Sequence, residues 1–168
     1  MSKSKQLTID QASVAYDKGR WKPAFRAFLV LAEQGDETAF LMLGFIYDTG
    51  QGARRNLAKA LQWYLRAYKV GGTTAALAAS NLATICRDNG DWRQEFQWYV
   101  RAAKLGDGDS LVEVEIRYLA GKGVKRSPTM AVKHFKAAVR SKNITEAGRD
   151  TAQQLLRSCK GWARARID

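Results

Sequence analysis

The chain has 168 residues and a formal net charge of +12, with 28 Lys and Arg, 16 Asp and Glu, and a sequence pI near 10.0. Its 46% hydrophobic and 26% charged residues are close to the globular average, which excludes a wholly disordered chain. No apolar run approaches the roughly 18 residues that span a bilayer, and no signal peptide is recognisable. Two cysteines form neither a disulfide framework nor a metal set. We expect a soluble, cytoplasmic protein with no cofactor and no membrane insertion.

An internal repeat organises the chain, since two segments carry nearly the same pattern 71 residues apart. Gly19-Arg20-Trp21 recurs as Gly90-Asp91-Trp92. A half-period of 35 residues carries Trp63, Tyr64, Ala67 and Gly71 onto Trp98, Tyr99, Ala102 and Gly106, with Glu95 in the place of Ala60. The pattern predicts four repeats, at about residues 6–35, 36–71, 72–106 and 107–142, within one domain over residues 6–157.

Each repeat has the pattern of two helices. Residues 38–47 place Phe40, Leu43, Gly44 and Tyr47 at helical spacing, and a second helix is expected over 57–70, where Gly71 would cap its end. One hairpin cannot bury its apolar face alone, whereas stacked hairpins can. The predicted fold is therefore all-α, an α-solenoid of four helix-turn-helix repeats of about 35 residues each.

A fifth helical pattern covers residues 144–157. Its packing face would be supplied by Ala147, Ala152, Leu155 and Leu156. Solenoids need a terminal cap with a polar outer side, so we predict a C-terminal capping helix here. Residues 158–168 are predicted to be a basic tail.

The second repeat also resembles a known family. The elements of the resemblance are Ala39, Leu43, Gly44, Tyr47, Gly50 and Gly52, followed by Ala60, Trp63, Tyr64, Ala67 and Gly71. This pattern is similar to the Sel-one-like repeat, a longer-looped relative of the tetratricopeptide repeat, and the resemblance extends over about residues 6–142. In the fourth repeat Glu115 replaces the small residue of the first helix. The resemblance implies an adaptor or scaffold for other proteins. Small bacterial members are also found as immunity proteins that neutralise secretion-system toxins.

The sequence offers no convincing catalytic constellation. His134, the single histidine, takes the helix-packing position that Trp63 holds in the second repeat. Glu113 and Glu115 are two apart on a predicted helix and point to different sides. The glycine pairs Gly50/Gly52 and Gly121/Gly123 lack the context of a phosphate loop and are interpreted as turns. Asp109 or Ser110 is expected to cap the helix that follows the turn at 107–109. We therefore predict that the protein is not an enzyme and holds no metal.

A partner-binding groove is implied by the resemblance, because the first helices of tetratricopeptide-like repeats line the concave surface. Carried over by register, its residues are Thr38, Leu41, Phe45, Asp48, Leu77, Ser80, Thr84, Arg87, Asp109, Val112, Ile116 and Leu119, with Gln6, Ile9, Ser13 and Tyr16 in the first repeat. Several of them are apolar, which favours a partner segment. The alternative is that curvature, or the C-terminal segment of the chain itself, buries them.

The positive charge is densest in the C-terminal part. Residues 107–168 hold half of the net charge, and a basic face is predicted from Lys122, Lys125, Arg126, Lys133, Lys136 and Arg140. This face is either simply solvated, or attracts an acidic protein, or contacts nucleic acid. The sequence thus predicts a non-enzymatic protein–protein interaction module for an acidic partner. The alternative function is a nucleic-acid-associated factor that uses the basic face and the tail.

Overall fold

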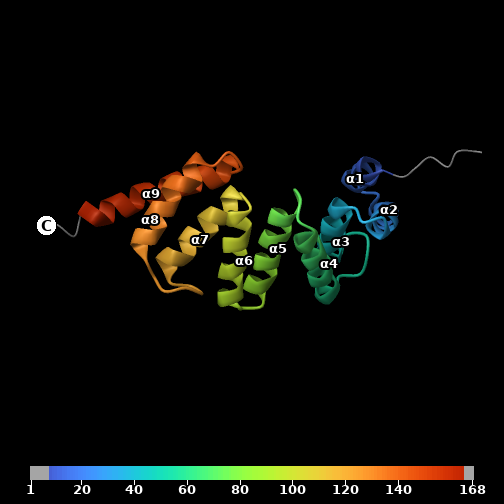
Figure 1. Cartoon of the computed structure of the whole chain (residues 1–168), viewed down its shortest axis with the longest axis horizontal. Coiled ribbons are helices and arrows are strands. Elements are labelled where there is room, and N and C mark those ends of the chain that lie inside the picture. Colours follow the sequence, from blue (N-terminus) through green and yellow to red (C-terminus); the bar gives the residue numbers. More distant parts are fainter. Residues whose placement is uncertain (1–7, 165–168) are drawn as a thin grey trace, which may run out of the picture. The chain divides into compact units, whose positions relative to one another are not determined.

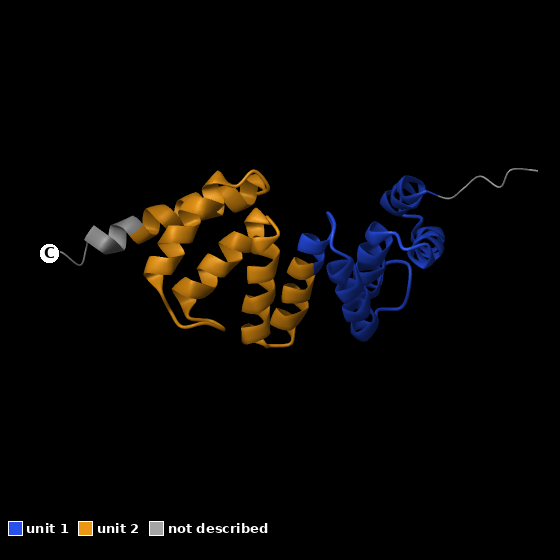
Figure 2. Ribbon diagram, viewed as in Figure 1, with its two compact units in different colours: residues 1–78 blue, residues 79–168 orange. Residues whose placement is uncertain are grey.

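The computed structural model describes residues 8–164, with side chains as far as Cys159. Within these residues every regular element is a helix (Figure 1), which agrees with the predicted all-α class. The helices are α1 (Ile9–Asp17), α2 (Trp21–Glu33), α3 (Glu37–Thr49), α4 (Leu57–Val70), α5 (Ala75–Asp88), α6 (Trp92–Lys104), α7 (Gly108–Ala120), α8 (Pro128–Arg140) and α9 (Glu146–Arg164). The chain divides into an N-terminal body, residues 1–78, and a C-terminal body, residues 79–168 (Figure 2).

Helix ends follow the expected capping chemistry. The Asn56 side chain accepts a hydrogen bond from the backbone N of Lys59 at 3.0 Å and begins α4, and Gly71, with φ +87°, ends it. Both bounds match the prediction. The cap of α7 was predicted wrongly: Asp107, not Asp109 or Ser110, accepts the hydrogen bond, from Ser110 N at 3.0 Å. Since α7 already begins at Gly108, Asp109 lies in its first turn.

The N-terminal body is built around small and aromatic side chains. Phe28 of α2, Leu43 of α3 and Tyr64 of α4 are fully buried. Gly44 permits the approach of α3 to α4, because a Cβ at this position would come within 2.6 Å of Tyr64 Cε1. Gly44 therefore allows close helix packing, as predicted, because it has no side chain that would collide with the Tyr64 ring.

The C-terminal body packs α6 to α9 in sequence, and α7 also contacts α9. Phe135 of α8 and Ala152 of α9 are fully buried, and Val112 of α7 joins them. A second cluster joins Ala83, Tyr99 and Val114. The aromatic residues named here thus lie at packing positions, as the repeat pattern predicts.

The last helix starts in register with a further repeat. Asp109 accepts a hydrogen bond from Thr145 Oγ1 at 2.8 Å, and Glu37 accepts one from Thr73 Oγ1 at 3.2 Å, both across 36 positions. Therefore α9 begins where the first helix of a fifth repeat would begin. Its backbone remains helical to Arg164, well past residue 157, so that residues 158–164 continue the helix where a tail was expected. Residues 165–168 lie outside the described residues.

Candidate functional site

The predicted groove residues of the N-terminal body lie on α3 and at the start of α5. Phe45 is 38% exposed, and its ring lies 6.3 Å from the ring of Tyr16 on α1, edge to face. Leu41 is half-buried against the core of this body, and Thr38 and Asp48 are also half-buried. Leu77 is 51% exposed. The face of α3 thus presents one aromatic side chain to solvent, with Tyr16 beside it.

In the first repeat, Ile9, Ser13 and Tyr16 are half-buried on α1. The Tyr16 hydroxyl donates a hydrogen bond to Gln51 Oε1 at 2.5 Å. Gln6 lies outside the described residues. The Tyr16 hydroxyl is therefore hydrogen-bonded to the loop after α3, and its ring packs next to the ring of Phe45.

On α5, the predicted groove residues of the C-terminal body are half-buried and polar. Ser80 O accepts a hydrogen bond from Thr84 Oγ1 at 3.3 Å, and Arg87 Nε lies 3.5 Å from Asp88 Oδ1. These side chains bring no apolar surface to that helix face.

On α7 the predicted groove residues pack against the C-terminal helix. Val112 is only 4% exposed, and Ile116 and Leu119 belong to the same apolar cluster as Leu155 and Leu156. Asp109 accepts hydrogen bonds from the backbone N and the hydroxyl of Thr145. The chain's own C-terminal segment therefore covers Val112. This agrees with the alternative interpretation, in which that segment buries the groove residues.

The six residues of the predicted basic face are all exposed on the 121–127 loop and α8. Lys122 Nζ lies 3.4 Å from the centre of the Trp92 ring, and Arg126 Nε donates to Leu119 O at 2.9 Å. Within residues 8–159, none of the six forms an ion pair with a carboxylate. Their charge is therefore not neutralised by the described part of the chain.

Sequence reasoning missed a buried ionic cluster in the C-terminal body. Glu95 of α6 is fully buried and binds Arg117 of α7, whose Nε donates to Glu95 Oε2 at 3.3 Å. Arg117 also binds Glu113, and its guanidinium lies 5.3 Å from the centre of the Tyr99 ring. The signal was the replacement of the repeat's Ala60 by Glu95. A buried carboxylate requires a partner, so this mismatch pointed to a cation nearby.

Glu115 and His134 form a second buried polar contact. Oε1 of Glu115, a fully buried residue, lies 2.9 Å from Nδ1 of His134. Burial raises the pKa of Glu115 to about 9. Burial, and then the charge of Lys133, lowers the pKa of His134. At neutral pH the Glu115 carboxyl therefore keeps its proton, and the His134 imidazole is neutral. Glu113 turns to Arg117, so the two glutamates do diverge as predicted.

Other chemistry finds little support among the described residues. They contain no group of three or more His, Cys, Asp or Glu side chains able to hold a metal ion. Cys86 is half-buried and Cys159 is buried, and both are free thiols. None of the described helices combines the length and apolar character that a membrane span requires.

A family model matches parts of the chain. The model for the Sel1 repeat matches residues 41–71, 96–107 and 116–143, which fall in the second, third and fourth predicted repeats. Among curated proteins, no sequence matches.

Solved structures with similar folds are also repeat proteins. One is a Sel1 repeat protein from Oxalobacter formigenes, 29% identical with a TM-score of 0.71, and the match covers 87% of this chain and 60% of that one. Another is a protective antigen of uropathogenic Escherichia coli strains that displays an SLR fold, 30% identical with a TM-score of 0.65 over 77% of this chain and 27% of that one. This chain thus spans less than two thirds of either structure. The matches confirm the α-solenoid prediction and the family resemblance.

Proposed function

We propose that this chain, which is similar to Sel1 repeat proteins, is a non-enzymatic module that binds an acidic partner protein. Sel1 repeat proteins are generally protein-interaction modules and typically act as scaffolds without enzymatic activity. The role is that of an adaptor, or of an immunity protein that neutralises a secreted bacterial toxin. The identity of the partner decides between these two roles.

The basic face is the observation that carries the proposal. Six exposed cations lie on one loop and one helix, and none of them forms an ion pair within the described residues. Exposed charge of one sign steers association with a partner of the opposite sign and contributes to specificity. An acidic protein surface is the partner that this charge favours.

Phe45 and Tyr16 supply apolar contact area for the same partner. They lie edge to face on α3 and α1, and Phe45 is 38% exposed. Aromatic side chains that are partly open to solvent are common anchors of protein interfaces. We propose that the face of α3 contacts the partner in the N-terminal body.

The alternative partner, nucleic acid, is less well supported by the C-terminal body. Binding of single strands combines cations with open aromatic faces on which bases stack. On the basic face, Lys122 already lies over the Trp92 ring. That aromatic face is therefore occupied from within the chain.

The test begins with affinity capture of the partner from the native cell, followed by calorimetry with the purified partner. The double variant Lys133→Glu with Lys136→Glu should bind at least tenfold more weakly, and the wild-type affinity should fall as salt rises. Phe45→Asp should also weaken binding. Ile116→Asp is a poor probe of the groove, because Ile116 packs against the core of the C-terminal body.

The matched control is Lys69→Glu with Lys104→Glu, which reverses two exposed cations on α4 and α6. If both double variants weakened partner binding equally, the effect would come from net charge in general and not from the basic face. Unchanged binding by a folded Phe45→Asp variant would remove the face of α3 from the proposal. Capture of nucleic acid in place of a protein would favour the alternative function.

A further inference from the structure

The two bodies contain equivalent loops that differ in one respect. Trp92 and the 121–127 loop lie 71 residues after Trp21 and the 50–56 loop. In the C-terminal body, Lys122 lies over the Trp92 ring at 3.4 Å. In the N-terminal body the equivalent residue is Gln51, which instead accepts a hydrogen bond from Tyr16. No cation of the described residues lies over Trp21 as Lys122 lies over Trp92.

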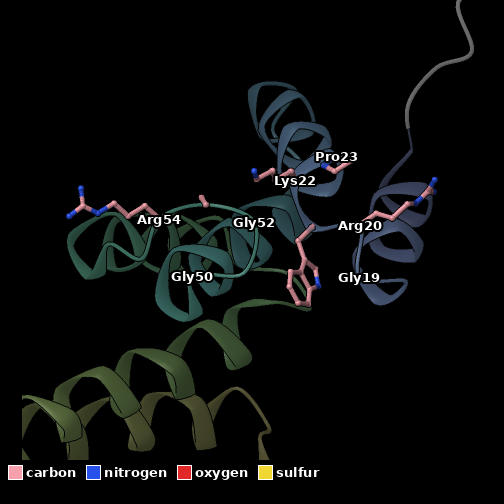
Figure 3. A pocket seen from close by; sticks show the side chains of 9 residues that line it. Gly19, Arg20, Lys22, Pro23, Gly50, Gly52 and Arg54 are labelled. Atoms are coloured by element: carbon pink, nitrogen blue, oxygen red, sulfur yellow. The ribbon is translucent and has the colours of Figure 1, made fainter.

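This difference accompanies an open pocket in the N-terminal body (Figure 3). Its volume is about 620 Å³, and it lies between the start of α2 and the loop that carries Gly50 and Gly52. Trp21, which lines it, is 44% exposed. The backbone approaches closely here, since a Cβ on Gly52 would come within 2.8 Å of Trp21 O. The pocket is thus lined by closely packed backbone at Gly52 and by the partly exposed indole ring of Trp21.

Positive charge surrounds the pocket and no carboxylate lines it. Arg20, Lys22 and Arg54 belong to its lining, are exposed, and form no ion pair within residues 8–159. The sequence contains no Asp or Glu at residues 18–32 or 49–87, the two segments that provide the lining. The lining therefore favours an anionic ligand.

The directions of the cations indicate the shape of that ligand. Figure 3 shows the Arg20 and Arg54 side chains extending away from each other, with Lys22 between them in this view. Side chains in this arrangement (Figure 3) suit several separated anionic groups better than one small anion such as phosphate. They can contact carboxylates that are spaced along an extended segment.

A row of stacked bases fits the pocket less well. Next to it, the rings of Phe25 and Tyr47 pack edge to face at 5.6 Å, and Lys59 Nζ lies 5.1 Å from the centre of the Tyr47 ring. Both neighbouring aromatic rings thus already have partners within the chain. Successive bases need successive open ring faces, and Trp21 provides one.

We propose that this pocket binds an acidic, extended peptide segment of the partner protein. An apolar side chain of the segment packs on Trp21, and its carboxylates contact Arg20 and Lys22 at one end and Arg54 at the other. The inference rests on the proposed function for its assumption that the partner is a protein. It adds a second contact surface, in the N-terminal body, to the basic face of the C-terminal body.

The test uses the full chain and a fluorescein-labelled peptide of alternating glutamate and leucine residues, with binding followed by fluorescence anisotropy. The double variant Lys22→Glu with Arg54→Glu should weaken peptide binding about tenfold or more. Trp21→Ala should weaken it as well. A peptide with glutamine in place of glutamate should bind poorly to the wild type.

The matched control is Arg93→Glu with Lys69→Glu. Arg93 is the 71-residue equivalent of Lys22, and this double variant changes the net charge by the same amount. Equal loss in both double variants, absence of peptide binding to the wild type, or equal binding of the glutamine peptide would each overturn the inference. A labelled oligothymidylate that bound more tightly than the peptide and was lost in the Lys22→Glu, Arg54→Glu variant would overturn it in favour of nucleic acid.

The captured partner separates this inference from the proposed function. If the partner binds the wild type and the Lys22→Glu, Arg54→Glu variant equally well, the pocket inference fails while the proposed function stands. If capture yields no protein partner although the peptide binds at the pocket, the proposed function fails. Loss of partner binding in this variant, with binding retained in the matched control, supports both.

Discussion

The buried contact between Glu115 and His134 predicts a specific dependence of stability on pH. The perturbation is Glu115→Gln, which keeps the shape of the side chain and removes its titration. In the folded chain burial raises the pKa of Glu115 from 4.5 to about 9, and burial lowers the pKa of His134 below 6.5. Tyr118 lies edge-on to the imidazole, with the ring centres 6.0 Å apart, and Lys133 is its neighbour in sequence.

The magnitude follows from the number of protons that the pair holds. Near pH 6.5 the folded pair keeps a proton on Glu115, while His134 of the unfolded pair begins to lose its proton as pH rises. Above pH 6.5 the unfolded pair loses its proton, whereas Glu115 retains one in the folded chain up to about pH 9. A raised folded pKa means that stability is lost as pH rises. The free energy of unfolding should fall by about 1.4 kcal/mol per pH unit in this window, or about 2 kcal/mol between pH 6.5 and pH 8.

The assay is urea unfolding followed by circular dichroism at both pH values. The wild type should lose about 2 kcal/mol over this range relative to Glu115→Gln, because the glutamine side chain does not titrate. Glu146→Gln serves as the control, since it removes an exposed carboxylate at the start of α9. If wild type and Glu115→Gln show the same slope between the two pH values, Glu115 does not hold a proton in the folded state and the reasoning is refuted.

Two further predictions concern the packing of neighbouring helices. Arg117→Leu should lower the free energy of unfolding by about 3 to 5 kcal/mol, since it leaves the buried Glu95 unpaired, and adding Glu95→Leu should restore part of the loss in urea unfolding. A double variant no more stable than Arg117→Leu would contradict the pairing. Gly44→Ala should destabilise by about 1 to 3 kcal/mol, because the new methyl would collide with the Tyr64 ring. On an exposed helix face the same change would stabilise the protein by up to about 1 kcal/mol. Thermal denaturation therefore distinguishes the two cases, since the midpoint falls if Gly44 is packed against Tyr64 and rises if it is not.

Local sequence patterns were sufficient to predict the helices. The bounds of α4 follow from its apolar spacing and from Gly71, whose φ of +87° suits glycine. Errors occurred where tertiary contacts decide. Asp107 could be recognised as the cap of α7 only once the helix was known to begin at Gly108, where its backbone N donates to Asn143 O at 2.7 Å. The length of α9 was underestimated, because its packing face was taken to end near Leu156.

The candidate site was harder to predict than the fold. Register places residues on faces of helices, but it does not reveal what covers a face. Ile116 is half-buried in the apolar cluster of the C-terminal body, whereas its equivalent Phe45 is 38% exposed. The pocket residues Arg20 and Arg54 are far apart in sequence, and they line the same pocket only because α2 packs next to the loop after α3. Glu95 and Arg117 are separated by 22 positions, so the mismatch in the repeat identified one partner and not the other.

The ion pair between Glu95 and Arg117 fixes the order of the hairpins in the C-terminal body. It joins the second helix of the third repeat to the first helix of the fourth. At the equivalent junction 71 residues earlier, between α2 and α3, the corresponding positions carry Ala24 and Ile46, which are apolar and buried. A gene rearrangement that placed another hairpin after α6 would leave the buried carboxylate of Glu95 unpaired. A rearrangement that moved α7 to another position would leave the guanidinium of Arg117 unpaired. Shuffling of repeats at this junction is therefore tolerated only when both residues move together.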